Sequence, residues 1–133
     1  MSGGTTSHGG SNPSVTADGS TRIEPHQKGS LFGKSGITAP MNSLLGVFLS
    51  ADDPINSVAS EKLNFSDANS RNYSSLLPKL GQVFFIGNGR FDGDKFQLVI
   101  VPKGATRLYF AIHDSYEWNN NSGTLQGAIL WRP

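Results

Sequence analysis

Apolar residues in the central part of the chain occur in short runs that are separated by turn residues. Residues 42–49 are almost entirely apolar, which predicts a strand that is buried on both of its faces. Residues 52–54, Asp-Asp-Pro, end this strand. Residues 82–86 predict a second strand, which ends at the glycine-rich turn of residues 87–89.

Alternating apolar and polar residues predict three further strands, at residues 95–101, 106–112 and 124–131. Residues 92–94, Asp-Gly-Asp, predict the turn before the first of these strands. In each of these strands a set of apolar residues shares one face: Phe96, Leu98 and Ile100; Leu108, Phe110 and Ile112; and Leu125, Ile129 and Trp131. We expect the second set to point into the core, with Arg107 and Tyr109 on the other face. Trp131 is expected to pack in the core or at a sheet edge.

Short strands with turn residues between them predict an all-β fold, a single antiparallel β-sandwich with little helix. One or two helical turns are expected within residues 71–77, before Pro78. The composition supports a turn-rich β fold, because 16 glycines and 7 prolines accompany 8 phenylalanines in 133 residues. Residues 1–17 are expected to be a flexible Gly/Ser-rich arm and residues 18–133 a single domain.

Charge and cysteine content exclude several classes of function. The formal net charge of +1 gives no electrostatic reason to expect nucleic acid or a membrane surface as a partner. The absence of cysteine excludes disulfides, thiolate zinc sites and cysteine nucleophiles. No apolar run approaches the roughly 18 residues that a membrane-spanning helix needs. The residues after Met1 do not have the pattern of a signal peptide.

Residues 111–123 begin as an apolar strand and continue into a cluster of oxygen donors. Asp114 supplies a carboxylate, and Asn120 and Asn121 supply amide carbonyls. Calcium prefers six to eight oxygens from such a mixture of carboxylate, amide, backbone and water ligands, so the segment predicts a calcium site. The alternative is an ordinary turn, in which Asp and Asn side chains bond to their own backbone.

Four segments resemble the bacterial calcium-dependent galactose-binding lectins and the related lectin-like domains of exported bacterial proteins. They are residues 42–48, 82–89, 101–108 and 120–123, and the resemblance covers roughly residues 18–131. The resemblance implies a small jelly-roll-like β-sandwich that is secreted or displayed on the cell surface. The family's lectins bind a sugar through a calcium ion, whose ligand shell is completed by two sugar hydroxyls.

The resemblance also implies roles for individual residues. Calcium would be held by the side chains of Asp114, Asn120 and Asn121, with Trp118 donating a backbone carbonyl. Asp114 and Asn120 would also hydrogen-bond to the sugar hydroxyls. His26 and Gln27 match the residues that contact the sugar's primary hydroxyl in that family.

The chain departs from the lectins in two places. The loop from Asp114 to Asn120 is a residue shorter, and it carries Glu117 and Trp118. The first strands of the family have no clear counterpart, which would leave an unpaired sheet edge. A partner strand, a swapped homo-oligomer or a missing N-terminal segment would each cover such an edge.

Two aromatic residues and one histidine in this region have alternative interpretations. Tyr116 and Trp118 suit apolar contact with a sugar, whereas the alternative for Trp118 is packing back over the domain. His113 alternates with Ile112, so we expect it to point away from the core. His113, Asp114 and Glu117 do not have the spacing of a glycosidase pair, and we expect no catalytic residues and no enzyme activity.

The sequence therefore favours a calcium-dependent carbohydrate-binding module in which the metal bridges two hydroxyls of a galactose-like sugar. The alternative is a structural module of a cell-surface oligomer or filament. In that alternative the open sheet edge forms the assembly and calcium only stabilises the loop.

Overall fold

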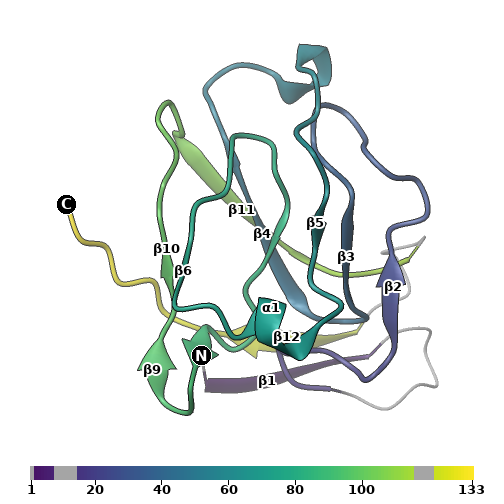
Figure 1. Ribbon diagram of the computed structural model, residues 1–133, viewed down its shortest axis with the longest axis vertical. Helices are drawn as coiled ribbons and strands as arrows, with labels where there is room; N and C mark the ends of the chain where they lie inside the picture. Colours follow the sequence, from purple (N-terminus) through teal and green to yellow (C-terminus); the bar gives the residue numbers. More distant parts are fainter. Residues whose placement is uncertain (1, 8–14, 116–121) are drawn as a thin grey trace.

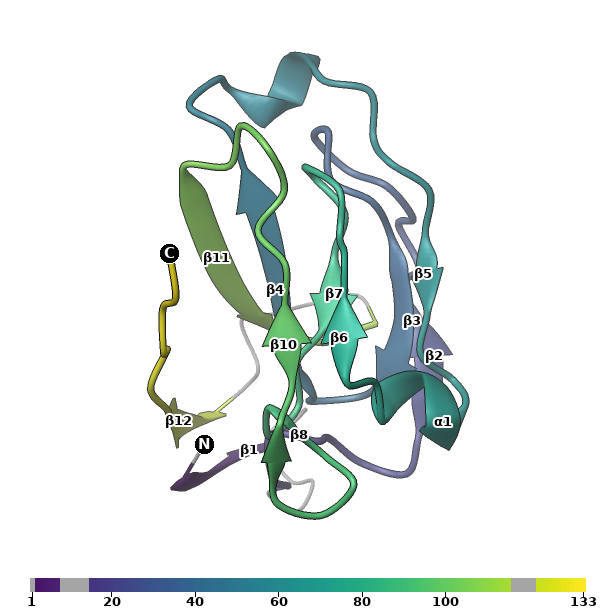
Figure 2. The ribbon, with the colours of Figure 1, turned by 60° about the vertical axis from the view of Figure 1, so that its left-hand side comes forward.

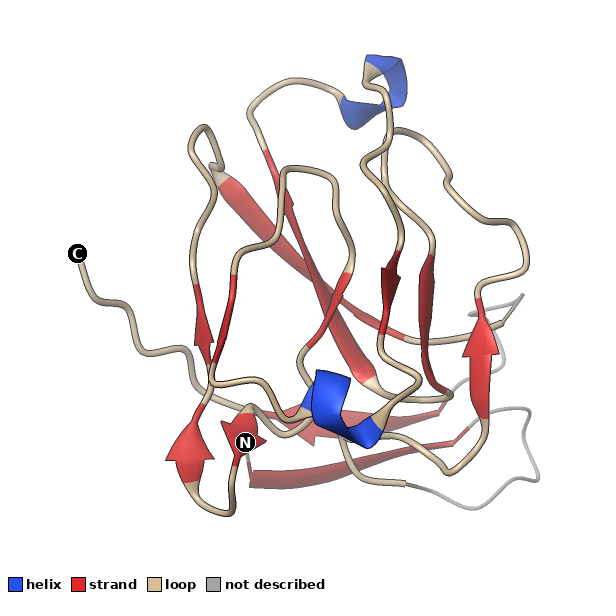
Figure 3. Cartoon of the chain, viewed as in Figure 1, coloured by secondary structure: helices blue, strands red, loops and turns tan. Residues whose placement is uncertain are grey.

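The computed structural model describes residues 2–7, 15–115 and 122–133, and short strands dominate them (Figures 1 and 3). The strands are β1 (Ser2–Ser7), β2 (Ile23–Pro25), β3 (Ile37–Pro40), β4 (Leu44–Leu49), β5 (Leu63–Asn64), β6 (Ser75–Leu76), β7 (Phe84–Phe85), β8 (Arg90–Phe91), β9 (Lys95–Phe96), β10 (Leu98–Val99), β11 (Arg107–Ile112) and β12 (Ser122–Gln126). The predicted all-β class is confirmed.

The helical content of the described residues consists of two single turns, each begun by an aspartate. The 3-10 turn η1 (Pro54–Asn56) starts where the Asp53 carboxylate accepts a hydrogen bond from the N–H of Ile55 at 3.0 Å. In the same way Asp67 accepts from the N–H of Asn69 at 2.9 Å and begins α1 (Ala68–Arg71). Because Asp67 caps it, α1 begins earlier in the chain than the helical turns that we expected within residues 71–77. Neither helix is long and apolar enough to cross a membrane.

Strand β4 is the centre of a three-stranded antiparallel sheet with the order β11-β4-β7. Its pairing with β11 is regular from Arg107 opposite Leu49 to Ile112 opposite Leu44. On its other side Leu45 lies opposite Phe85. Every residue of β4 is buried, which confirms the prediction of a strand that is covered on both faces.

The other described strands form four smaller sheets around this one (Figure 2). Strand β3 pairs antiparallel with β2 and parallel with β5, and β10 pairs parallel with β6. The hairpin β8–β9 encloses the turn that was predicted at residues 92–94. The two parallel pairs were not expected, because the chain was predicted to be wholly antiparallel. The sandwich arrangement of the sheets stays a prediction.

The glycine-rich N-terminal segment contains a strand. Residues Ser2–Ser7, which we expected to belong to a flexible arm, form β1 and pair antiparallel with β12. No alternation of apolar residues predicts this strand, because its residues are Gly, Ser and Thr. Residues 8–14 lie outside the described residues, and the boundary between arm and domain stays a prediction.

The hydrophobic core is formed by side chains from the three strands β3, β4 and β7 and by the residue after β5. They are Ile37, Ala39, Leu45, Phe48, Phe65, Phe84 and Phe85. Two pairs of rings tie the strands together, with ring centroids 5.5 Å apart for Phe48 and Phe84 and 5.8 Å apart for Phe65 and Phe85. The aromatic residues therefore connect the β4 sheet to β5.

Several residues that we expected in the core are exposed. Phe110 is about half exposed and Trp131 is largely exposed, so their assignment to inward or packed positions was wrong. The alternating pattern identifies residues that share a face, but it does not show whether another layer covers that face. Leu108, by contrast, packs against the core.

Two buried serines differ in their hydrogen bonding and allow a matched test. The Ser35 hydroxyl accepts a hydrogen bond from the N–H of Val83 at 2.9 Å, whereas the buried Ser43 hydroxyl has no hydrogen-bond partner. We expect Ser35→Ala to lower the free energy of unfolding by about 1–3 kcal/mol, since it leaves a buried N–H unpaired. Ser43→Ala should be neutral or stabilising. Urea denaturation measures both, and equal losses would contradict this assignment.

Candidate functional site

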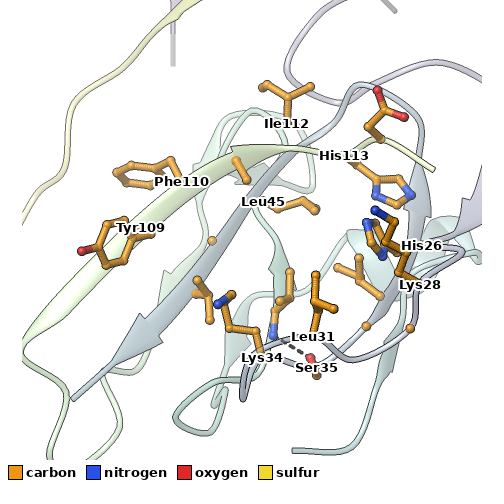
Figure 4. A pocket seen from close by; sticks show the side chains of 18 of the residues that line it. His26, Lys28, Leu31, Lys34, Ser35, Leu45, Tyr109, Phe110, Ile112 and His113 are labelled. Carbon is orange, nitrogen blue, oxygen red and sulfur yellow. Dashed lines mark hydrogen bonds between the residues drawn. The ribbon is translucent and has the colours of Figure 1, made fainter. Parts of the chain in front are cut away.

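A cavity of about 460 Å³ is lined by residues 26–37, β4 and the segment from β11 to Asp114 (Figure 4). Most of the side chains around it are apolar, among them Leu31, Ile37, Val47, Leu49, Val83 and Tyr109. At one end the lining becomes polar, with His26, Lys28, His113 and Asp114. An apolar cavity with a few polar groups at one end is the usual form of a small-ligand site.

The polar end is held in place by the continuation of the β4–β11 pairing beyond the end of β11. The N–H of His113 donates to the carbonyl of Ser43 at 2.8 Å, and the N–H of Asn42 donates to the carbonyl of His113 at 2.9 Å. His113 and Asp114 are each only 1% exposed. Our expectation that His113 lies at the surface was therefore wrong. The alternation of His113 with Ile112 predicts only that their side chains point to opposite faces of the strand. It does not reveal that the segment after β2 covers the face on which His113 lies.

The imidazole of His113 is fixed by a backbone carbonyl of β2. Its Nε2 lies 2.9 Å from the carbonyl oxygen of Glu24, which can only accept, so Nε2 carries the hydrogen in the neutral ring. Burial lowers the pKa of His113. The hydrogen bond to the Glu24 carbonyl raises this pKa, and the nearby His26 lowers it further. Figure 4 shows the rings of His26 and His113 next to each other at the end of the cavity.

The two residues that were predicted to contact a sugar on an early loop lie beside this segment. The N–H of His26 donates to the carbonyl of Ile37 at 2.9 Å, which extends the pairing of β2 with β3. The N–H of the next residue, Gln27, donates to the carbonyl of Ser115 at 2.9 Å. His26 is half-buried and Gln27 is exposed. The fold therefore brings His26 and Gln27 next to Asp114 and Ser115.

The remaining predicted site residues are outside the part of the chain that the structure describes. These residues are Tyr116, Trp118, Asn120 and Asn121. Among residues 2–7, 15–115 and 122–133, no group of three or more His, Asp or Glu side chains could hold a metal ion. Asp114 is the one predicted calcium ligand within these ranges, and calcium binding stays a prediction.

Sequence reasoning missed three residues that line the cavity. Lys28 and Lys34 were not among the predicted site residues, and His113 was placed at the surface. Lys28 comes immediately after His26 and Gln27 in the sequence, and this position could have indicated that Lys28 lies at the same site. Nothing local in the sequence indicates Lys34, because it reaches the cavity through the fold of residues 31–34, where Leu31 and Lys34 bond to each other's backbone.

Comparison of the chain with models of protein families, with curated proteins and with solved structures finds no match. The resemblance to the galactose-binding lectins therefore stays a prediction. The function of the site has to be argued from its own residues.

The burial of His113 predicts how stability depends on pH. Unfolded His113 binds a proton near its ordinary pKa of 6.5, whereas in the folded protein the lowered pKa keeps the ring neutral at more acidic pH. The unfolded state therefore binds more protons, and the free energy of unfolding falls as pH drops through 6.5. The contribution of this one residue is at most about 1.4 kcal/mol per pH unit.

We expect His113→Gln to give a shallower loss of stability than the wild type over this range. The measurement is urea denaturation of the chelator-treated protein at a series of pH values. Parallel curves for the two proteins would show that His113 does not remain neutral on folding.

Proposed function

We propose that this chain is a calcium-dependent carbohydrate-binding module with a galactose-like sugar as its ligand. Asp114 and the loop that follows it hold the calcium, and His26 and Gln27 contact the sugar. One observation carries the proposal: the hydrogen bond from the N–H of Gln27 to the carbonyl of Ser115, at 2.9 Å. It joins the two segments to which the sequence assigned the sugar contacts and the metal.

Asp114 would supply the one charged ligand of the cation, since the other proposed ligands are amide and backbone carbonyls. A calcium ion bound there would hold sugar hydroxyls in place of its own waters. The further ligands would come from Trp118, Asn120 and Asn121.

The neighbouring residues would fix the orientation of the sugar. The exposed Gln27 side chain offers both a donor and an acceptor, and the half-buried His26 offers its ring nitrogens. A monosaccharide has few atoms, so binding at one site would be weak. The proposal contains no catalytic step, and it is compatible with a secreted or cell-surface protein.

Asp114→Asn should abolish or strongly weaken calcium binding, by about tenfold or more, because it removes the charge of the ligand and keeps its shape. The measurement is calorimetric titration of calcium into chelator-treated protein, followed by galactose into the calcium-loaded form. Asp52→Asn is the matched control, since Asp52 is an exposed carboxylate in another loop. Absence of calcium binding by the wild type would refute the metal site.

Gln27→Ala should leave calcium binding unchanged and weaken galactose binding by about threefold to tenfold, the effect of one lost hydrogen bond. Gln126→Ala, at an exposed position of β12, is the control and should change neither. Calcium binding by the wild type without any galactose binding would mean that the metal is only structural, and would overturn the carbohydrate function.

A further inference from the structure

Strand β11 has one open edge. In the described part of the chain it is the outermost strand of the sheet β11-β4-β7. Because His113 bonds to Ser43 and pairing alternates along an antiparallel ladder, the odd-numbered residues of β11 bond to β4. The backbone N–H and C=O groups of Leu108, Phe110 and Ile112 therefore point to the open side.

This edge lacks the features that usually prevent another strand from pairing. Edge strands are commonly protected by Pro, Lys, a bulge or a very short length. The register of β11 with β4 is regular over all six of its residues, and the strand contains neither Pro nor Lys. Its one charged side chain, Arg107, is at the start of the strand and donates to the carbonyls of Ser50 and Asp52. Tyr109 and Phe110 are about half exposed on it. The edge is thus a long, regular and apolar template for an added strand.

The same chain carries an extended apolar segment that its own fold does not cover. Residues 127–133 follow β12 and lead away from the body of the protein (Figures 1 and 2). Ile129, Leu130 and Trp131 are 66%, 78% and 69% exposed. Consecutive exposed apolar residues of this kind mark an interaction site, and β-branched and aromatic residues favour strands.

We propose that residues 128–131 of a second copy of this chain add as a strand to the open edge of β11. The partner is a second copy because, within the described part of one molecule, the segment is exposed and the edge is unpaired. The segment has no charge between Ala128 and Trp131, so it suits an apolar edge. Side chains alternate along a strand, so one face of the added strand, either that of Ile129 and Trp131 or that of Leu130, would lie on the side of the cavity that Tyr109 lines.

Two variants separate the two halves of this interface. Ile129→Asp with Trp131→Asp charges the segment, which is exposed and can be changed without disturbing the fold. Phe110→Pro removes an N–H that points to the open side and leaves the bonds to β4 in place. The matched control is Val58→Asp, which places the same charge on an almost fully exposed residue of a different loop. Circular dichroism verifies that each variant is folded.

Sedimentation velocity over a range of protein concentrations tests the proposal, with chelator present so that the result does not depend on calcium or sugar. The wild type and Val58→Asp should associate equally, and each interface variant should associate at least tenfold more weakly. A mixture of the two interface variants should regain association, because one supplies an intact edge and the other an intact segment. A monomeric wild type, unchanged association of either variant, or a mixture that stays monomeric would overturn the proposal.

Discussion

The burial of β4 is the constraint on which the rest of the structure depends. A strand that is covered on both faces and paired at both edges has no freedom of register, since a shift by one residue would exchange its two faces. Each of its buried leucines and its phenylalanine stabilises the fold by about 1.5–3 kcal/mol. Gly46 shows how closely the neighbours approach, because a Cβ there would lie 2.7 Å from the ring of Phe84. Only glycine lets β7 pack at this distance.

The candidate site derives its geometry from this strand. Pairing with β4 sets the position of β11, and the residues just before β4 hold His113 through its backbone N–H and C=O. From the other side, β3 positions β2 and the His26–Gln27 segment. The bond between Gln27 and Ser115 and that between His113 and Glu24 join the two sheets at one point. Residues that are far apart in the sequence thus meet because two strand pairings end at the same place.

The sequence predicts the parts of this arrangement that depend on local pattern. The apolar run at 42–49 and the alternation at 106–112 correspond to β4 and β11, and the Asp-Gly-Asp turn lies within the β8–β9 hairpin. Strand β1 could not be predicted, because its glycines and hydroxyl residues form a strand only through a distant partner. The burial of His113 and the exposure of Phe110 depend on which segments cover a face, and a single strand's pattern contains no such information. His26 and Gln27 were found through a family resemblance, not through any local rule.

Strand β11 takes part in both of the proposed interactions, but with different backbone groups. Its odd-numbered residues bond to the fully buried β4, which fixes the segment that leads to Asp114. Its even-numbered residues present their backbone groups to the open side, so a strand added there would not change the pairing that positions His113. Association and sugar binding would then be structurally independent within one molecule. They would still act together on a surface that displays many sugars, because joining two weak sites raises the effective concentration for the second binding event. The proposed monosaccharide site and the edge that is open in the described part of the chain would divide these two roles within one small domain.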